Sequence, residues 1–151
     1  FTRLKFNPEI INKDILDWTC TKTFKYILLD APCSATGTIR KHPDLIFLKN
    51  KNELGKYIKT QQALLEKALS LLSTQGQLIY CVCSVQKNEG IKQVDHILKK
   101  FKNIRREPIK KSEFTQFEKY ITKDGDIQTF PYMKKPGGMD GFFISRLYKE
   151  Y

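Results

Sequence analysis

The chain has 151 residues, of which 40% are apolar and 28% charged, as expected of one ordinary folded domain and not of a disordered or fibrous chain. No apolar run approaches the roughly 18 residues that a membrane-spanning helix needs, and the first residues lack the apolar core of a signal peptide. Basic residues exceed acidic ones by 11, which favours a polyanionic partner such as nucleic acid. Because 22 of the 27 basic residues are lysine, a lysine-rich proteome is the alternative explanation.

Cysteine and histidine usage argues against a metal centre. The four cysteines are Cys20, Cys33, Cys81 and Cys83, and none of their spacings matches a zinc motif. Neither histidine lies at ligand spacing from a cysteine pair. Since no secretory signal is present, we expect free thiols in a reducing cytoplasm, with no membrane association.

Hydrophobic periodicity predicts alternating strands and helices. In chain order these are the end of a helix at 1–6, a strand at 9–13, a buried strand at 26–29, a basic loop at 31–50, a helix at 57–72 ended by Gln75-Gly76, a strand at 77–82, a helix at 88–101 capped by Asn88, a strand at 104–109 and a final strand at 141–148. Residues 110–128 show no clear pattern. The order predicts an α/β sandwich with a largely parallel sheet, in which the last two strands form a hairpin edge with one antiparallel strand.

Reactive side chains follow two of the buried strands. Asp30 ends the strand at 26–29 and is followed by Pro32 and Cys33, whereas Cys83 ends the strand at 77–82. Because ligands bind at the carboxyl ends of parallel strands, we expect a carboxylate and two thiols in one crevice. The helix that begins after Cys83 favours its thiolate form. Cys81 points to the same face but sits deeper in the strand, where a packed core cysteine is the ordinary outcome.

Four segments together resemble one enzyme family. They are FTRLKFNPEIINKDILDW at the start of the chain, DAPCSATGTIRKHPDL from Asp30, LIYCVCSVQKNEG from Leu78 and DGFF from Asp140. They are similar to the signature motifs of the Sun/Fmu (Nol1/Nop2/Sun) family of S-adenosylmethionine-dependent RNA cytosine-5 methyltransferases, nearest to the bacterial enzymes that modify 16S ribosomal RNA. The resemblance implies an incomplete Rossmann-like methyltransferase fold.

The resemblance also implies a covalent mechanism. Cys83 stands where the family has its nucleophile, in a Thr-Cys-Ser motif whose threonine is Val82 here. Thiolate addition at C6 of the cytosine activates C5 toward the methyl group of the cofactor, S-adenosyl-L-methionine. Cys33 matches a second thiol that helps to release the product, and Asp30 matches the aspartate at the junction of cofactor and target base. The target cytosine has to leave its base stack to reach this crevice.

Further residues are assigned to binding by the same resemblance. Asp14, together with Asp30, matches the acidic residues that contact the cofactor. The residues that would approach ribosomal RNA lie in one loop and are Ser34, Thr36, Gly37, Arg40, Lys41 and His42.

The family's first cofactor motif, a glycine-rich loop after the first strand, has no counterpart in these residues, and neither has the N-terminal RNA-binding domain of bacterial members. We therefore expect residues 1–151 to be the C-terminal part of a single methyltransferase domain, with an exposed apolar sheet edge where two strands are lacking. Three alternatives remain: a non-catalytic RNA-binding remnant, a half that works with a separately encoded N-terminal half, and a thiol redox protein using Cys81 and Cys83.

Overall fold

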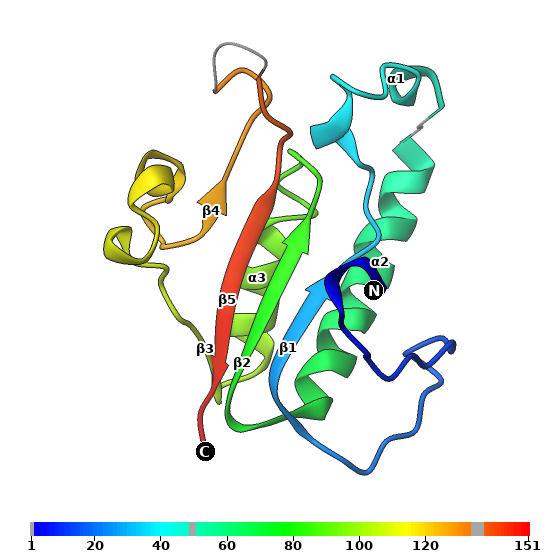
Figure 1. The fold of residues 1–151 in the computed structure, drawn as a ribbon, viewed down its shortest axis with the longest axis vertical. Helices are drawn as coiled ribbons and strands as arrows, with labels where there is room; N and C mark the ends of the chain where they lie inside the picture. The colour runs from blue at the N-terminus through cyan, green and yellow to red at the C-terminus, as the bar shows by residue number, and fades with distance from the viewer. Residues whose placement is uncertain (1, 49–50, 134–137) are drawn as a thin grey trace.

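Five strands form one sheet at the centre of the molecule (Figure 1). A computed structural model describes residues 2–48, 51–133 and 138–151. The sheet order is β1-β2-β5-β3, and β4 pairs with the first residues of β5. The strands are β1 (Phe24–Asp30), β2 (Leu72–Val82), β3 (Ile104–Arg106), β4 (Ile127–Gln128) and β5 (Phe143–Lys149). Because β5 is antiparallel to β2, β3 and β4 while β1 is parallel to β2, every strand except β5 runs in one direction.

Two helices cover one face of the sheet and bury the main core (Figure 1). They are α2 (Lys51–Leu71) and α3 (Ile91–Lys100). The alternating residues Leu78, Tyr80 and Val82 of β2 point toward these helices and are fully buried, as expected for one face of a pleated strand. The shorter helices are α1 (Leu45–Leu48) and the 3-10 turns η1 (Thr2–Leu4), η2 (Thr36–Thr38), η3 (Lys111–Glu113) and η4 (Thr115–Tyr120).

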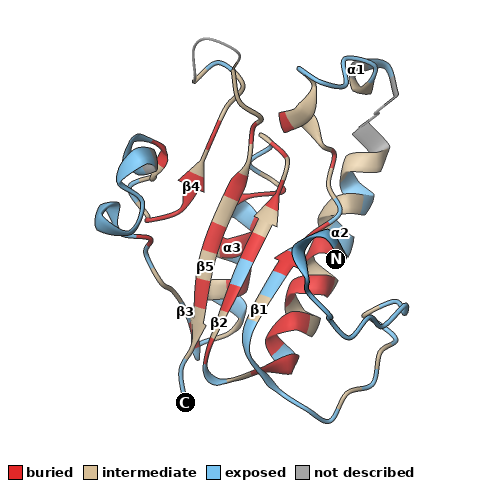
Figure 2. Ribbon diagram, in the orientation of Figure 1, coloured by how far each residue is buried: buried red, intermediate tan, exposed pale blue. Residues whose placement is uncertain are grey.

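The opposite face is open over β1 and β2. Tyr26 and Leu28 of β1 are 68% and 69% exposed, and Ile79, which lies opposite Leu28 in the ladder, is 38% exposed. Figure 2 shows this exposure as pale blue along β1. Within the described residues β1 pairs with β2 alone, so its other edge keeps unpaired backbone donors and acceptors. This face and edge therefore present apolar side chains and unpaired backbone groups to solvent.

Several predicted boundaries were wrong. The helix expected from Tyr57 begins at Lys51 despite Gly55, and it ends at Leu71 because β2 begins at Leu72. Gln75-Gly76 does not cap this helix; it lies inside β2, where Gln75 has a φ of 59° and the pairing with β1 shifts register. Tertiary pairing with β1 therefore overrides the local glycine signal.

Other differences lie nearer the chain ends. Residues 9–13 form no strand, and residues 31–48 contain η2 and α1, while residues 49–50 of the expected loop lie outside the described residues. Residue Gly90, not Asn88, precedes α3, and no side chain caps it. The strand expected at 104–109 stops at Arg106, and β5 lies between β2 and β3 instead of at the edge.

The segment after β3 adds a small second core on the open side of β5. Ile109, Tyr120 and Ile127 are buried there, and Ile144 of β5 packs against them. This segment places Asp140 and Gly141 at the start of β5, beside the ends of β1 and β2. No helix in the described part of the chain is long and apolar enough to cross a membrane.

Candidate active site

The parallel pairing of β1 and β2 brings both cysteine segments together at the carboxyl ends of the strands. Asp30 lies opposite Cys81, and the ladder continues past the strand because the Ala31 N–H donates to the Cys81 carbonyl at 3.0 Å. The chain beyond β1 then places the Cys33 sulfur 3.4 Å from the Cys83 sulfur. Both thiols are free and partly buried. The two thiols that we expected in one crevice are therefore in contact.

Two of the three thiols in this region are held neutral. Burial raises the pKa of Cys81 to about 12, and Asp30, which accepts its S–H at 3.6 Å, adds to the rise. Burial also raises the pKa of Cys33 to about 12, with further contributions from Cys83 and Glu89. Because the thiolate is the nucleophilic form of cysteine, Cys33 and Cys81 are poorly suited to attack an electrophile near neutral pH.

A chain of backbone contacts fixes the loop that carries Cys33. The Gly37 N–H donates to the Cys83 carbonyl at 3.0 Å, and the Gly141 N–H donates to the Gly37 carbonyl at 2.8 Å. The two glycines are so close that a β-carbon on Gly37 would lie 1.9 Å from the Gly141 oxygen. Three motifs that are far apart in sequence thus meet through main-chain atoms, and only glycine fits at their junction.

Basic residues flank the site on the same loop. Lys41 and Arg40 both bind the Asp140 carboxylate, at 2.6 and 3.3 Å, and their side chains are 55% and 42% exposed. The hydrogen bond from Lys41 is the main cause of the lowered pKa of Asp140. The exposed His42 follows them. These three side chains are the part of the expected RNA-binding set that faces outward.

The remaining residues of that set shape the loop from inside. Ser34 and Gly37 are buried, and the Thr36 hydroxyl lies 3.1 Å from that of Ser84 while accepting from the Val85 N–H. Contact between these three residues and RNA stays a prediction, and the burial of Ser34 and Gly37 indicates an internal role.

The two aspartates expected to contact the cofactor are both exposed. Asp30 lies at the end of β1 on the open face, bonded to the Cys81 thiol. Asp14 lies in the loop before β1, where its carboxylate accepts the Leu16 N–H at 2.9 Å. No hydrogen bond or ion pair links the two in the described chain. Among those same residues no cluster of histidine, cysteine and carboxylate groups could hold a metal ion.

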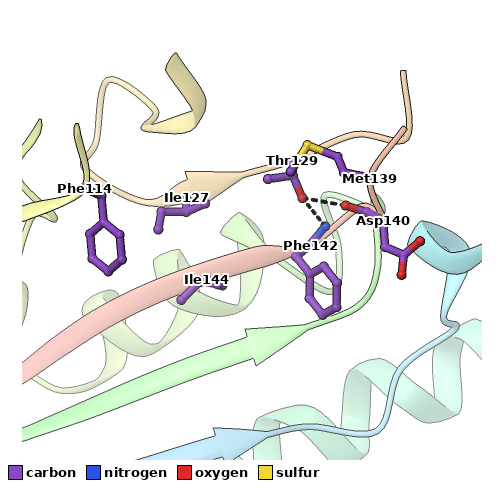
Figure 3. A pocket seen from close by; sticks show the side chains of 7 residues that line it. All are labelled: Phe114, Ile127, Thr129, Met139, Asp140, Phe142 and Ile144. Carbon is purple, nitrogen blue, oxygen red and sulfur yellow. Dashed lines mark hydrogen bonds between the residues drawn. The ribbon is translucent and has the colours of Figure 1, made fainter. Parts of the chain in front are cut away.

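An apolar cavity adjoins the site at Asp140. It has a volume of about 340 Å³ and is lined by Phe114, Ile127, Thr129, Met139, Asp140, Phe142 and Ile144 (Figure 3). The Thr129 hydroxyl donates to the Asp140 carbonyl and accepts the Phe142 N–H. The Asp140 carboxylate is paired with Lys41 and Arg40. Because the polar side chains of the wall already bond to other protein groups, the cavity presents a mainly apolar surface to any ligand.

Sequence reasoning missed the buried carboxylate beneath the thiols. Glu89, just before α3, is completely buried and bonds to residues of both cysteine segments and to Gln61 of α2. The available signal was the repeated Cys-Ser pair, Cys33-Ser34 and Cys83-Ser84. Two buried hydroxyls at matching positions require acceptors, and a nearby carboxylate supplies them.

The fold belongs to a known class. The crystal structure of NSun6 from Pyrococcus horikoshii with SFG matches 95% of this chain and 35% of that chain, with a TM-score of 0.73 and 21% identity. A mostly parallel sheet with one antiparallel strand agrees with this likeness, and the chain has a partial Rossmann-like methyltransferase fold. The family model described as 16S rRNA methyltransferase RsmB/F matches residues 1–148, and the chain belongs to that family.

Curated relatives carry the same description. Ribosomal RNA small subunit methyltransferase B of Photorhabdus laumondii is 33% identical over 87% of this chain and 28% of its own length. Ribosomal RNA small subunit methyltransferase F of Shewanella pealeana is 33% identical over 85% of this chain and 26% of its length. The chain therefore spans between a quarter and a third of these relatives.

Proposed function

We propose that this chain carries the catalytic-cysteine part of a cytoplasmic methyltransferase domain. Its substrate is a cytosine of small-subunit (16S) ribosomal RNA, methylated at C5 with S-adenosyl-L-methionine through a covalent Cys83–C6 adduct. The observation that carries the proposal is the contact of Cys33 and Cys83 at 3.4 Å beside the Asp30 strand end. The family match and the basic loop support ribosomal RNA as the partner.

The chemistry assigns one task to each side chain. The Cys83 thiolate adds to C6, which makes C5 nucleophilic enough to take a methyl group. N3 takes a proton from solvent as the thiolate adds, and the Asp30 carboxylate stabilises the resulting N3–H and exocyclic amine by accepting a hydrogen bond from them. After methyl transfer a base removes the C5 proton, the S–C6 bond breaks and Cys83 leaves as thiolate. A neutral Cys33 thiol touching the Cys83 sulfur is placed to assist that departure.

The residues present fit one part of a cofactor site. S-adenosyl-L-methionine supplies an electrophilic methyl group on a sulfonium cation. The exposed Asp30 carboxylate, on the open face beside Cys81, suits a cation there, and the exposed Asp14 suits a hydroxyl donor. A glycine-rich loop would add backbone N–H groups at a helix N-terminus. We propose that the polypeptide supplying this loop also covers Tyr26, Leu28 and Ile79.

This incomplete site leads to a prediction about the chain by itself. We expect residues 1–151 to bind labelled S-adenosyl-L-methionine too weakly for turnover, because the donors of the glycine-rich loop are not among them. Equilibrium titration of the purified chain, followed by a methyl-transfer assay on ribosomal RNA, checks this. Micromolar binding with turnover would show that the chain builds a full cofactor site by itself. RNA binding without turnover, even after an N-terminal half is added, would favour the non-catalytic remnant.

Removing the second thiol should trap the intermediate. In an active preparation we expect Cys33→Ala to accumulate a covalent protein–RNA species, because the group that assists departure of Cys83 is lost. Cys33→Ala/Cys83→Ala should give none. Denaturing gels of both variants with RNA and cofactor provide the measurement. A covalent species in the double variant would refute the assignment of both thiols.

The basic loop should bind RNA through charge. Arg40→Ala/Lys41→Ala should weaken RNA binding and reduce the slope of log affinity against log salt by about one to two units. The reason is that a protein with fewer cations displaces fewer counterions from the RNA when it binds. Lys92→Ala/Lys99→Ala, on exposed positions of α3, is the matched control. An equal loss in both variants would point to non-specific attraction by the whole basic surface.

The structure does not pair the two cysteines of the redox alternative, Cys81 and Cys83, with each other. Cys83 touches Cys33, whereas Cys81 is bonded to Asp30. A Cys81–Cys83 pair therefore has no support from the geometry, and the family match favours methyl transfer.

A further inference from the structure

Glu89 is a completely buried carboxylate with all of its acceptor sites in use. One oxygen accepts the Ser34 N–H at 2.8 Å and the Gln61 amide at 3.1 Å. The other accepts the hydroxyls of Ser34 at 2.5 Å and Ser84 at 2.6 Å. A buried charge is costly unless such bonds compensate it, and four donors match the roughly four lone-pair sites of a carboxylate.

The donors come from the residues that directly follow the two thiols. Ser34 follows Cys33 on the segment after β1, and Ser84 follows Cys83 at the end of β2. Their hydroxyls lie 3.2 Å apart over the same carboxylate oxygen. Gln61 of α2 also donates to the Pro32 carbonyl, which ties the Cys33 segment to the helix layer. One side chain therefore holds both cysteine segments at once.

We propose that Glu89 is the positioning residue of this site: it holds Cys33 and Cys83 in contact through Ser34 and Ser84. A second and smaller consequence is a charge effect, in which the Glu89 carboxylate beside the Cys33 segment opposes a further negative charge on Cys33. At 3.4 Å either thiol can donate its S–H to the other sulfur. The consequence for catalysis rests on the proposed function, whereas the geometry and the charge effect do not.

The electrostatics of the cluster agree with this division of roles. Burial is the main cause of the raised pKa of Cys33, and Cys83 and Glu89 raise it further. The other titratable groups facing the cluster are Cys81 and the Tyr80 phenol, which donates to the Glu89 carbonyl and whose pKa burial also raises. A negative charge at short range in a poorly solvated site disfavours a second one. The Glu89 charge therefore opposes ionisation of Cys33.

The positioning role is tested by oxidation with diamide, which takes two electrons and two protons from a thiol pair. Peptide mapping by mass spectrometry then follows the Cys33–Cys83 disulfide. We expect Glu89→Ala to slow its formation about tenfold or more, because both serines lose their shared acceptor. Glu89→Gln should form it at least as fast as the unchanged protein, because serine hydroxyls can reverse and accept from the amide. Equal rates in Glu89→Ala and the unchanged protein would overturn the positioning role.

The charge effect is tested by the pH profile of alkylation. With iodoacetamide, Glu89→Gln should raise the Cys33 rate at mildly alkaline pH, because one of the causes that raise the pKa of Cys33 is removed, although burial, the main cause, remains. Cys81 in the same sample is the internal control, because its raised pKa comes from burial, Asp30 and Cys83. Glu118→Gln, at an exposed position of η4, removes the same charge elsewhere and should change neither rate.

An unchanged Cys33 profile in Glu89→Gln would overturn the charge effect. Circular dichroism identifies a variant that fails to fold, and if Glu89→Ala fails, the near-isosteric Gln variant still decides the proposal. Neither measurement needs RNA or cofactor. A failure here is therefore distinguishable from a failure of the methyltransferase proposal, which activity assays test.

Discussion

Replacing Cys83 by serine is expected to abolish methyl transfer while leaving the fold intact. In a preparation active on ribosomal RNA, we expect the rate to fall at least about a thousandfold, or about 4 kcal/mol in activation free energy. An alcohol near neutral pH is a far weaker nucleophile than a thiolate. The other thiols are not expected to substitute, because burial, the main cause of the raised pKa of Cys33 and of Cys81, is the same in this variant.

The matched control is Cys81→Ser, two residues earlier in the same strand. Cys81 donates to Asp30, and a serine hydroxyl can keep that bond, so we expect less than about a tenfold loss. Single-turnover methyl transfer under matched conditions measures both variants. If the two lose activity equally while circular dichroism shows intact folds, the nucleophile has been assigned to the wrong thiol.

Gly37→Ala is expected both to destabilise the protein and to displace the loop that carries Cys33 from its place beside Cys83. The added β-carbon would lie 1.9 Å from the Gly141 carbonyl oxygen, and both atoms belong to main chain that side-chain rotation cannot move. Relieving the overlap separates Gly37 from Cys83 and Gly141 and weakens two hydrogen bonds. Overpacking and the lost bonds together should cost about 3 kcal/mol or more, or about 6–12 °C in melting temperature.

Gly55→Ala provides a control of opposite sign. Gly55 is exposed inside α2, and a β-carbon there would meet no atom within 4 Å. Because alanine has a higher helix propensity, this variant should gain about 0.5–1 kcal/mol. Thermal unfolding of both variants checks the pair. A Gly37→Ala variant as stable as the unchanged protein would mean that this junction is not closely packed.

Much of the fold could be predicted because its signals are local. The strand before Cys83 and the helix after it were confirmed because apolar periodicity reports which face is covered. The segment before Asp30 was confirmed as a strand, but it was wrongly expected to be buried, because Tyr26 and Leu28 lie on the open face and are 68% and 69% exposed. The position of β5 between β2 and β3 could not be predicted, because pairing order depends on contacts between distant residues. The helix end predicted at Gln75-Gly76 was wrong for the same reason, because a glycine fits a helix end and a strand bulge equally well and only the pairing with β1 distinguishes them.

The candidate site was predictable only at the level of its motifs. The expected meeting of Cys33 and Cys83 is confirmed by their contact. Glu89 was missed because its role depends on burial beneath both segments, which residue spacing does not reveal. Ser34 and Gly37 were assigned to RNA because they lie in the loop expected to approach it. In the structure the Ser34 side chain donates to the buried Glu89, and the Gly37 backbone packs against the Gly141 main chain. The roles of the individual site residues stay predictions.

Trapping with RNA that contains 5-fluorocytidine tests whether Cys83 forms a covalent bond with the target cytosine. Fluorine at C5 cannot leave as a proton does, so the thiolate cannot depart after methyl transfer. The chain is incubated with substituted 16S RNA, S-adenosyl-L-methionine and a cofactor-binding half in trans, and ordinary RNA verifies turnover. We predict a methylated nucleotide on the peptide containing Cys83, absent from Cys83→Ser. An adduct on another cysteine, or 5-methylcytosine formed from ordinary RNA with no adduct on the substituted RNA, would contradict the mechanism.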